Sequence, residues 1–351
     1  MKFSICIPNY NYERYLGETI RSALDQQGVD LEILLSDNAS TDTSLAIAQA
    51  FNDPRIQCRV NAVNVGFAGN LDRAARMAGG DYLIMLSSDD LIRPGTLATY
   101  QALFAQASPN QPTVISSSWD VISSTGEVIG RDGPDPDLWT EADRVPALDK
   151  VAGGPVYRVA GDELLRRCLK RMRNPFNFAA TCYARTLYDR VEGYGGSRMM
   201  NPDKAFSWKL LGVTEAAYWV DARLFAYRVH NTNQLSQESA AGALKFMVDE
   251  YVSTLEIDSA VLARVGISRE SVFESFVEND IGRHGLATLA KGQRAKARRI
   301  LDFGRAAYPA QVRRNRYARA LRTLLALGPV GQKIASRLYR SYQSRSGQKL
   351  P

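Results

Sequence analysis

The sequence predicts an α/β protein, in which a mostly parallel, Rossmann-like β-sheet carries helices on both faces and is followed by a helical extension. Short apolar segments alternate with amphipathic ones over residues 3–118, which is typical of parallel strands joined by crossover helices. After residue 238 the strand-like segments stop and only helical spacing continues. The predicted domains are therefore residues 1–238, with the sheet, and residues 239–351, a helical and basic C-terminal region.

The first part of the chain alternates strands and helices in a regular order. Apolar, β-branched runs predict strands at residues 3–8, 31–36, 56–60, 81–87 and 112–118. Apolar residues at helical spacing predict helices at residues 13–26, 42–51, 68–78 and 94–107. Pro94 suits the first turn of the last helix, where a missing N–H costs nothing. Sheets of this kind bind ligands beyond the carboxyl ends of their strands.

The second part of the chain is less regular. Residues 126–156 are rich in Gly, Pro and Asp and lack periodicity, so they predict a long loop of a length that is often functional. The remaining elements are a helix at 161–171, strands at 178–183 and 217–229, a helix at 203–211 between them, several helices over 244–307, and one or two over 312–342 broken at Gly328-Pro329.

Composition restricts the class of protein. Hydrophobic residues make up 45% and charged residues 23% of the 351 residues, which favours a globular chain over a disordered one. No run approaches the roughly 20 apolar residues that cross a bilayer, and the first residues indicate a strand rather than a signal peptide. The four cysteines, Cys6, Cys58, Cys168 and Cys182, are expected to be reduced thiols of a cytoplasmic protein. Because the chain has only two histidines, a Cys/His zinc site is not expected.

Charge is distributed unevenly along the chain. Residues 291–351 contain 16 Lys and Arg but a single acidic residue, Asp302, whereas the rest of the chain is acidic overall. Arginines interleaved with leucines predict amphipathic helices, which favour peripheral attachment to an anionic membrane surface, the inner face of the plasma membrane, where a lipid-linked acceptor would be found. A helical cap with a solvated basic face is the alternative. Nucleic acid is not expected as a partner, because no RNA-binding motif occurs.

Polar residues gather at the carboxyl ends of four predicted strands. Because parallel strands bring these ends to one edge, the four groups are expected to meet there. They are Pro8-Asn9-Tyr10-Asn11, the turn from Ser36-Asp37-Asn38 to Asp42, the segment from Asn64 through Gly66 to Asn70, and Ser87-Ser88-Asp89-Asp90.

Asp89 and Asp90 are the sharpest feature of these groups. Carboxylates directly after a buried strand can hold Mg²⁺ or Mn²⁺, with waters and substrate phosphates completing the shell. The alternative for Asp90 is to cap the helix near Pro94. Asp37 could bond a base or ribose or could cap a helix, and for Asp42 capping is favoured. Tyr10 could stack on a nucleobase or be an ordinary aromatic residue of the rim.

The segments PNYN, SDNASTD, NVGFAGN and GDYLIMLSSDD, in this order, resemble family 2 glycosyltransferases, which have the GT-A fold. Asn201-Pro202-Asp203 before an amphipathic helix resembles the acidic catalytic-base motif of that family, and Tyr227-Arg228-Val229-His230 resembles its closing strand. The resemblance covers roughly residues 1–236. Two departures stand out: Ser87 replaces an Asp that many members have, and Pro202 replaces a common Glu.

The resemblance implies an inverting, metal-dependent transfer of a sugar from a nucleoside-diphosphate donor to an acceptor hydroxyl, in bacterial surface-polysaccharide synthesis. UDP or dTDP is the favoured nucleotide, with GDP as an alternative, and the acceptor is a saccharide or is lipid-linked. Asp203 is implied to be the general base, Tyr10 and Asp37 to contact the base of the nucleotide, and His230 to lie near the diphosphate and metal. The expected metal residues are Asp89, Asp90 and His230. The expected donor-binding residues are Pro8, Asn9, Tyr10, Asn11, Asp37, Asn38, Asn64, Gly66, Asn70, Ser88, Arg228 and His230.

Two other functions fit parts of the sequence. A nucleotidyltransferase would also use an α/β sheet and an acidic metal site, but it would need a basic, phosphate-gripping loop near the first strand, which PNYNYERY does not supply. A non-catalytic sugar-nucleotide-binding protein is supported only by the missing acid at Ser87. Acceptor choice is expected in the 126–156 loop and the helical tail.

Overall fold

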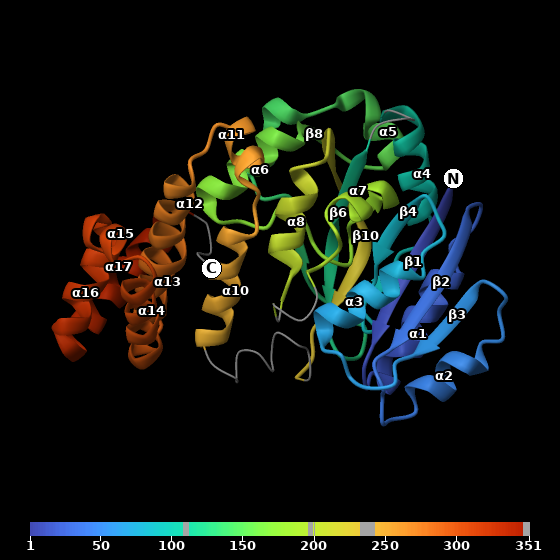
Figure 1. Cartoon of the computed structure of the whole chain (residues 1–351), viewed down its shortest axis with the longest axis horizontal. Helices are drawn as coiled ribbons and strands as arrows, with labels where there is room; N and C mark the ends of the chain where they lie inside the picture. Colours follow the sequence, from blue (N-terminus) through green and yellow to red (C-terminus); the bar gives the residue numbers. More distant parts are fainter. Residues whose placement is uncertain (108–111, 196–198, 200, 232–242, 347–351) are drawn as a thin grey trace. The chain divides into compact units, whose positions relative to one another are not determined.

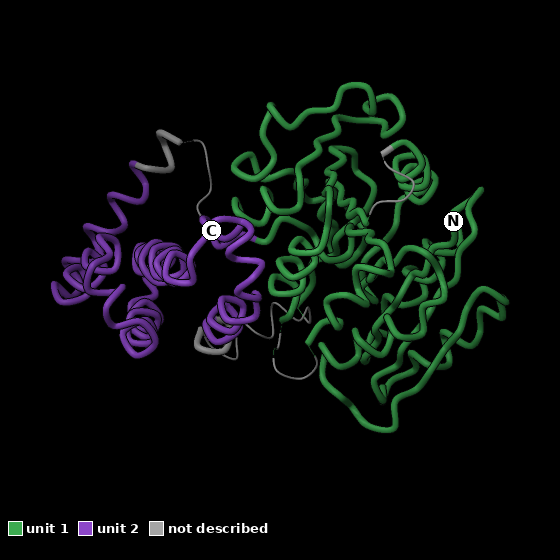
Figure 2. Tube along the Cα trace, turned by 45° about the horizontal axis from the view of Figure 1, so that its top comes forward, with its two compact units in different colours: residues 1–167, 174–233 green, residues 168–173, 234–351 purple. Residues whose placement is uncertain are grey.

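The computed structural model describes residues 1–107, 112–195, 199, 201–231 and 243–346, and the chain forms two compact units (Figures 1 and 2). Unit 1 comprises residues 1–167 and 174–233, and unit 2 comprises residues 168–173 and 234–351. The boundary predicted at residue 238 lies outside the described residues.

Unit 1 is built on a ten-stranded sheet with the order β3-β2-β1-β4-β9-β6-β10-β5, in which β7 also pairs with β6 and β8 with β10. Strands β1 to β4 are parallel to one another, β6 is parallel to β10, and β9 runs antiparallel between β4 and β6. The strands are β1 (Lys2–Asn9), β2 (Asp30–Asp37), β3 (Ile56–Val60), β4 (Tyr82–Met85), β5 (Leu91–Ile92), β6 (Thr113–Ile122), β7 (Val128–Asp132), β8 (Val156–Ala160), β9 (Cys182–Ala184) and β10 (Ala216–Arg228).

Helices cover both faces of the sheet, as the continuous burial of β1 requires (Figure 1). Alternate residues of a strand point to opposite faces, and Ile5 and Ile7 share a core with Leu16 of the first helix. The third helix packs on β1 and β2 with Leu71 fully buried. The α-helices of unit 1 are α1 (Glu13–Leu24), α2 (Ser44–Ala50), α3 (Phe67–Arg76), α4 (Thr96–Ala107), α5 (Asp149–Ala152), α6 (Gly161–Arg171, whose last residues belong to unit 2), α7 (Arg185–Arg190) and α8 (Asp203–Leu211).

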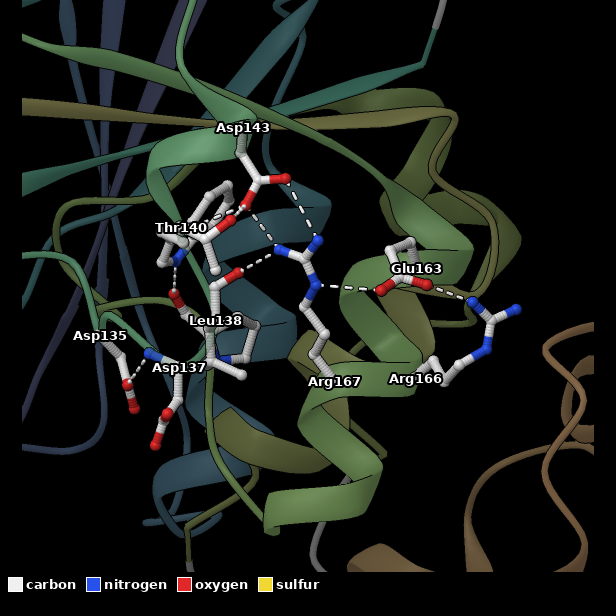
Figure 3. Close-up of polar contacts among 10 residues, drawn as sticks. Asp135, Asp137, Leu138, Thr140, Asp143, Glu163, Arg166 and Arg167 are labelled. Atoms are coloured by element: carbon white, nitrogen blue, oxygen red, sulfur yellow. Dashed lines mark hydrogen bonds and ion pairs between the residues drawn. The ribbon is translucent and has the colours of Figure 1, made fainter.

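The segment 126–156 is not the irregular loop that the sequence predicts. It contains β7, two 3₁₀ turns (Glu141–Asp143 and Pro146–Leu148) and α5. Arg167 of α6 holds it from outside: its guanidinium donates to Asp143 Oδ2 at 2.6 Å and to the Leu138 carbonyl at 2.8 Å, and it also pairs with Glu163 (Figure 3). These long-range bonds order a segment that has no apolar periodicity of its own.

Two smaller differences from the prediction have local causes. Helix α4 begins at Thr96 rather than Pro94, because Gly95 adopts a left-handed φ of 79° that a helix cannot include. The predicted strand at 178–183 is reduced to β9, which begins at Cys182. The other predicted strands and helices of this unit are confirmed.

Unit 2 is helical, as predicted. A break separates its last two helices, and the second of them begins at Gly328. Among the described residues, none of the helices combines the length and the apolar character that crossing a bilayer requires. The elements are α10 (Ala243–Leu255), α11 (Ser259–Arg264), α12 (Arg269–Phe276), a π-helical turn η4 (Val277–Arg283), α13 (His284–Ala290), α14 (Arg294–Ala307), α15 (Pro309–Arg314), α16 (Arg316–Ala326) and α17 (Gly328–Ser346).

Candidate active site

The polar groups that follow β1, β2 and β4 meet at the carboxyl edge of the sheet. Asn9 and Asp37 are direct partners in the pairing of β1 with β2. The Ser88 hydroxyl, just after β4, donates to the Pro8 carbonyl at 2.9 Å. Because the three strands are adjacent and parallel, residues far apart in the sequence form one rim.

Asp37 is buried at the centre of one part of this rim. Its carboxylate accepts hydrogen bonds from Asn9 Nδ2 at 2.8 Å, from Ser40 Oγ at 2.6 Å and from Ser40 N at 2.9 Å. Asn9 Oδ1, on the opposite side of the same amide, is buried without a hydrogen-bond partner among the described residues. An unpaired buried acceptor is costly, so this atom is suited to a donor on a ligand.

An asparagine network connects the ends of β2 and β3 to α3. Asn38 Nδ2 donates to Asn64 Oδ1 at 2.9 Å and to the Gly66 carbonyl at 3.2 Å. Asn70 accepts from Ser36 Oγ at 2.8 Å and donates to the Ser36 carbonyl at 3.0 Å. These predicted donor-site residues therefore lie together, and their amides mainly hold the rim in shape.

Tyr10 and Asn11, the residues that directly follow β1, complete this side of the rim. Asn11 has a left-handed φ of 58°, and its side chain accepts from Thr41 N at 2.8 Å. Tyr10 is 43% exposed, so its ring is accessible to a ligand.

Asp42 binds N–H groups at two helix starts, as the capping role favoured for it implies, although Thr43 holds the N-cap position of α2. Its carboxylate accepts from Ser44 N, at the start of α2, and from Glu13 N, at the start of α1, both at 2.9 Å. Glu13 in return accepts from Thr43 N and Thr43 Oγ1. The pair fixes the two helix starts that flank the rim.

The second half of the rim is acidic. Asp89 Oδ2 lies 3.0 Å from His230 Nε2, and the Asp90 carboxylate accepts from Arg228 N at 2.9 Å. Asp90 lies well before α4 and does not cap it. His230 is buried, and its ring packs against Tyr15 with centroids 4.6 Å apart. The end of β10 therefore closes over the turn after β4.

The buried carboxylate of Asp90 is hydrogen-bonded within the protein, by Arg228 N and by Ser87. Burial, and then the charge of Asp89, raise the pKa of the Asp90 carboxyl well above its usual value. The Arg228 N–H and the Ser87 hydroxyl, which bond the carboxylate, oppose that rise. Ser87, the departure noted in the sequence, is thus a hydrogen-bond partner of Asp90.

Arg228 is almost fully buried at 1% exposure and acts as a brace. Its Nε donates to the Asp89 carbonyl at 2.9 Å, its Nη2 pairs with Glu18 at 2.7 Å, and its guanidinium lies 4.9 Å from the Tyr15 ring centroid. Through these bonds Arg228 braces the acidic turn from the end of β10.

We expect Arg228→Met to lower the free energy of unfolding by about 2–3 kcal/mol, because a buried charge-assisted bond to Asp89 and the pair with Glu18 are lost. Urea denaturation measures this change. The control Glu18→Gln should cost less than about 1 kcal/mol, since its side chain is 54% exposed. Equal small effects of the two substitutions would contradict the bracing role.

Asp203 and the acidic turn both act on the hydroxyl of Tyr227. Burial, followed by the charges of Asp90, Asp89 and Asp203, raises the pKa of Tyr227 to about 12. Asp203 is the first residue of α8, with Pro202 rather than Asp203 at the cap position, so it is not the N-cap of that helix.

Among the described residues, no group of three or more His, Cys, Asp or Glu side chains is placed to hold a metal ion. The acidic turn offers a smaller set, Asp89 with His230. A hard cation bound mainly through substrate phosphates commonly uses only one or two carboxylates. The residues present therefore fit a cation that arrives with a diphosphate.

The sequence did not point to several residues of the rim. Asn61 follows β3, bonds Asn38 and Asn70, and would have been found by the same strand-end argument. Glu18 faces outward from α1 and pairs with a residue 210 positions away, so no local signal marks it. Tyr12 is a further neighbour: burial, and then Asp89 and Asp90, raise its pKa.

Comparison with known sequences finds glycosyltransferases that resemble the first part of this chain. Residues 4–134 match the model described as glycosyl transferase family 2. The abequosyltransferase RfbV of Salmonella typhimurium is 38% identical over 107 residues, which is 29% of this chain and 32% of that protein. Chondroitin synthase of Escherichia coli is 38% identical over 93 residues, 26% of this chain and 13% of that one. The matches thus span a third or less of these relatives.

Comparison with solved structures extends over the whole chain. TarS 1–349 from S. aureus, solved with UDP-GlcNAc, covers 100% of this chain and 93% of its own, with a TM-score of 0.64 at 18% identity. The mannosyltransferase PcManGT from Pyrobaculum calidifontis, solved with GDP-Man and Mn²⁺, covers 99% of this chain and 88% of its own, with a TM-score of 0.51 at 15% identity. These likenesses establish the fold.

Proposed function

We propose, from the match of residues 4–134 to the glycosyl transferase family 2 model, that the protein transfers a sugar from a nucleoside-diphosphate donor to an acceptor hydroxyl. The observation that carries the proposal is the rim itself. It brings Asp37 and Asn9 to one edge of the sheet together with the Asp89–His230 pair, in the position where such sheets bind nucleotides.

The nucleotide would bind on the Asp37 side of the rim. Three of the roughly four acceptor positions of the Asp37 carboxylate are used within the protein, which leaves one for a ligand N–H or hydroxyl. The unpartnered Asn9 Oδ1 is a second acceptor, and the exposed ring of Tyr10 could stack on the base. We favour UDP or dTDP donors, with GDP as the alternative. TarS was solved with UDP-GlcNAc and PcManGT with GDP-Man, which supports keeping both kinds of base as candidates.

The diphosphate would lie over the acidic turn. Asp89 and His230 would hold a divalent cation, Mg²⁺ or Mn²⁺, and Asp90 would support them from behind through Arg228 and Ser87. When bound, the cation would neutralise the charge that develops on the leaving diphosphate. PcManGT was solved with GDP-Man and Mn²⁺, which supports the proposal of a divalent cation.

Asp203 would act as the general base. A sugar hydroxyl is a poor nucleophile at neutral pH, and a carboxylate within hydrogen-bond reach can take its proton as attack begins. Asp203 acts on the same Tyr227 as Asp89 and Asp90, which supports its place beside the donor. Attack from the face opposite the leaving group would invert the anomeric centre.

We expect an accepted nucleotide sugar to raise the melting temperature of the protein in the presence of Mn²⁺. At a ligand concentration of about 100 Kd, binding to the native state adds roughly 2.7 kcal/mol of stability. A thermal-shift screen of UDP, dTDP and GDP sugars, each with and without Mn²⁺, measures this, and slow release of nucleoside diphosphate then tests for catalysis.

The result of this screen separates the candidate functions. Binding without any release would favour a non-catalytic sugar-nucleotide-binding protein, and release of inorganic pyrophosphate from a nucleoside triphosphate would favour a nucleotidyltransferase. If no nucleotide sugar is bound with any divalent cation, the proposed transferase function is wrong.

The helical unit would bring the enzyme to a lipid-linked acceptor at the inner, cytoplasmic face of a membrane, in bacterial polysaccharide synthesis. On α17, Val330, Ile334 and Leu338 are 61%, 40% and 63% exposed. Their spacing of four places them in one row, and Lys333 and Arg337 form the adjacent row. An exposed apolar row beside a cationic row suits an anionic bilayer surface.

We expect Ile334→Asp/Leu338→Asp to reduce binding to vesicles of phosphatidylcholine and phosphatidylglycerol by about tenfold or more, because each buried apolar side chain contributes about 1.5–3 kcal/mol. Flotation of the full chain measures this. The control Ile129→Asp changes a residue that is also 61% exposed but lies on β7 of unit 1. Equal binding of the wild type and both variants would reject attachment through α17.

A further inference from the structure

Unit 2 contains a cavity that the proposed transferase site does not use. It has a volume of about 240 Å³ and lies between the ends of α14, α15 and α16. Four of its lining residues are arginines, Arg305, Arg313, Arg319 and Arg322. Val312 and Ala318, both buried, form part of its wall.

The local sequence brings these four exposed arginines to the same part of unit 2. Arg319 and Arg322 are three residues apart on α16 and so lie on one face of that helix. Arg305 and Arg313 lie in the last turns of α14 and α15, where the helix dipole favours a cation. Because α15 is short, both of these helix ends lie close to the start of α16.

The positive charge at this cavity is almost uncompensated by the protein. Arg305 has a weak pair with Asp302 at 3.9 Å, and within the described part of the chain no ion pair involves Arg313, Arg319 or Arg322. Asp302 is also the last acidic residue in the sequence. Grouped like charges destabilise the folded state, and an anion in the cavity would remove that cost.

We propose that this cavity binds a phosphate group with two or more negative charges, such as a phosphate monoester or a diphosphate. The planar guanidinium fork matches phosphate oxygens bidentately and gives strong charge-assisted bonds. A volume near 240 Å³ is smaller than the roughly 300–1,000 Å³ of drug-sized pockets. The site is therefore suited to a compact anion, borne either by a lipid headgroup or by a soluble molecule.

The first experiment measures binding of inorganic pyrophosphate to the full chain by calorimetry, in EDTA so that no divalent cation supports binding at the transferase site. We expect one bound pyrophosphate, and Arg319→Gln/Arg322→Gln should weaken it at least tenfold. The control Arg298→Gln/Arg299→Gln removes the same charge from exposed positions of α14 outside the cavity and should weaken it less than twofold. Circular dichroism melting confirms that all variants are folded.

The outcomes distinguish specific binding in the cavity from nonspecific binding of the anion to basic residues on the surface. Equal weakening by the two double variants, or no binding by the wild type, would overturn the proposal. The variant Asp89→Asn in EDTA should bind pyrophosphate like the wild type, so that failure of the transferase function and failure of this site are distinguishable.

A second arm identifies the source of the phosphate. Vesicles containing phosphatidic acid carry a phosphate monoester, and vesicles of equal charge made with phosphatidylglycerol carry only diesters. A lipid source predicts that the wild type prefers phosphatidic acid and that Arg319→Gln/Arg322→Gln loses this preference. A soluble source predicts pyrophosphate binding in calorimetry without any such preference, and the absence of both effects would contradict the site.

Discussion

Replacing Asp89 with asparagine should reduce the release of nucleoside diphosphate from the donor by about 10²–10³-fold, the usual cost of removing one electrostatic contact to a developing charge. The substitution keeps the shape of the side chain and its position beside His230, but it removes the charge that would hold a cation over the turn. The donor should also lose most of its Mn²⁺-dependent thermal shift. Both effects are measured on the same purified chain with the donor found in the screen.

The matched control for this experiment is Asp81→Asn. Asp81 comes directly before β4, whereas Asp89 follows it, so the two carboxylates lie at opposite ends of one strand. Asp81 is bonded by Lys2 N and should leave donor release unchanged. If Asp89→Asn retains activity within a few-fold of Asp81→Asn, the acidic turn is not the diphosphate site.

Asparagine at position 203 should lower kcat by about 10²–10⁴-fold, the range typical of a lost general base, and leave donor affinity within about twofold. The reason is that Asp203 is proposed to contact the acceptor hydroxyl and not the nucleotide. The separation of kcat from donor affinity is the diagnostic readout, because a merely structural carboxylate would change both through misfolding. It is measured as donor hydrolysis and as donor-induced thermal shift.

Asp162→Asn is a suitable comparison for Asp203→Asn. Asp162 also lies in the first turn of a helix, α6, so it controls for the loss of a carboxylate near a helix N-terminus. It should leave kcat unaltered. A loss of donor binding in Asp203→Asn would instead assign Asp203 to the donor site.

Much of the parallel half of the fold could be predicted from the sequence because its signals are local. The strands β1 to β4 are apolar runs, and the helices between them have clear periodicity, so the strand ends and their polar residues follow directly. Asp37, Asn38, Asn70 and Ser88 are consequently found together at one edge, as expected.

The antiparallel half of the fold could not be predicted in this way. Strand β5 is only two residues long, and its place depends on pairing with Phe225 and Ala226 of β10. The order of residues 126–156 depends on Arg167, which is distant in sequence. The contact of Arg228 with Glu18 likewise arises only when β10 takes its place in the sheet.

The departure at Ser87 is informative about the site. In the sequence, the missing acid at Ser87 is the only support for a non-catalytic protein. In the structure the Ser87 hydroxyl bonds the Asp90 carboxylate, which is already held by Arg228 N. An acid at position 87 would place a third negative charge beside Asp89 and Asp90, so the serine limits the repulsion within the turn.

The bonds from β10 to the turn after β4 have a consequence for biosynthesis. Arg228 and His230 meet Asp90 and Asp89 across 138 and 141 residues, so the ribosome must complete nearly all of unit 1 before this arrangement can exist. Contacts of such long range form slowly and late in folding. A nascent chain that has emerged only through residue 134 carries both acids with neither basic partner, and we expect it to be unable to retain a nucleotide sugar.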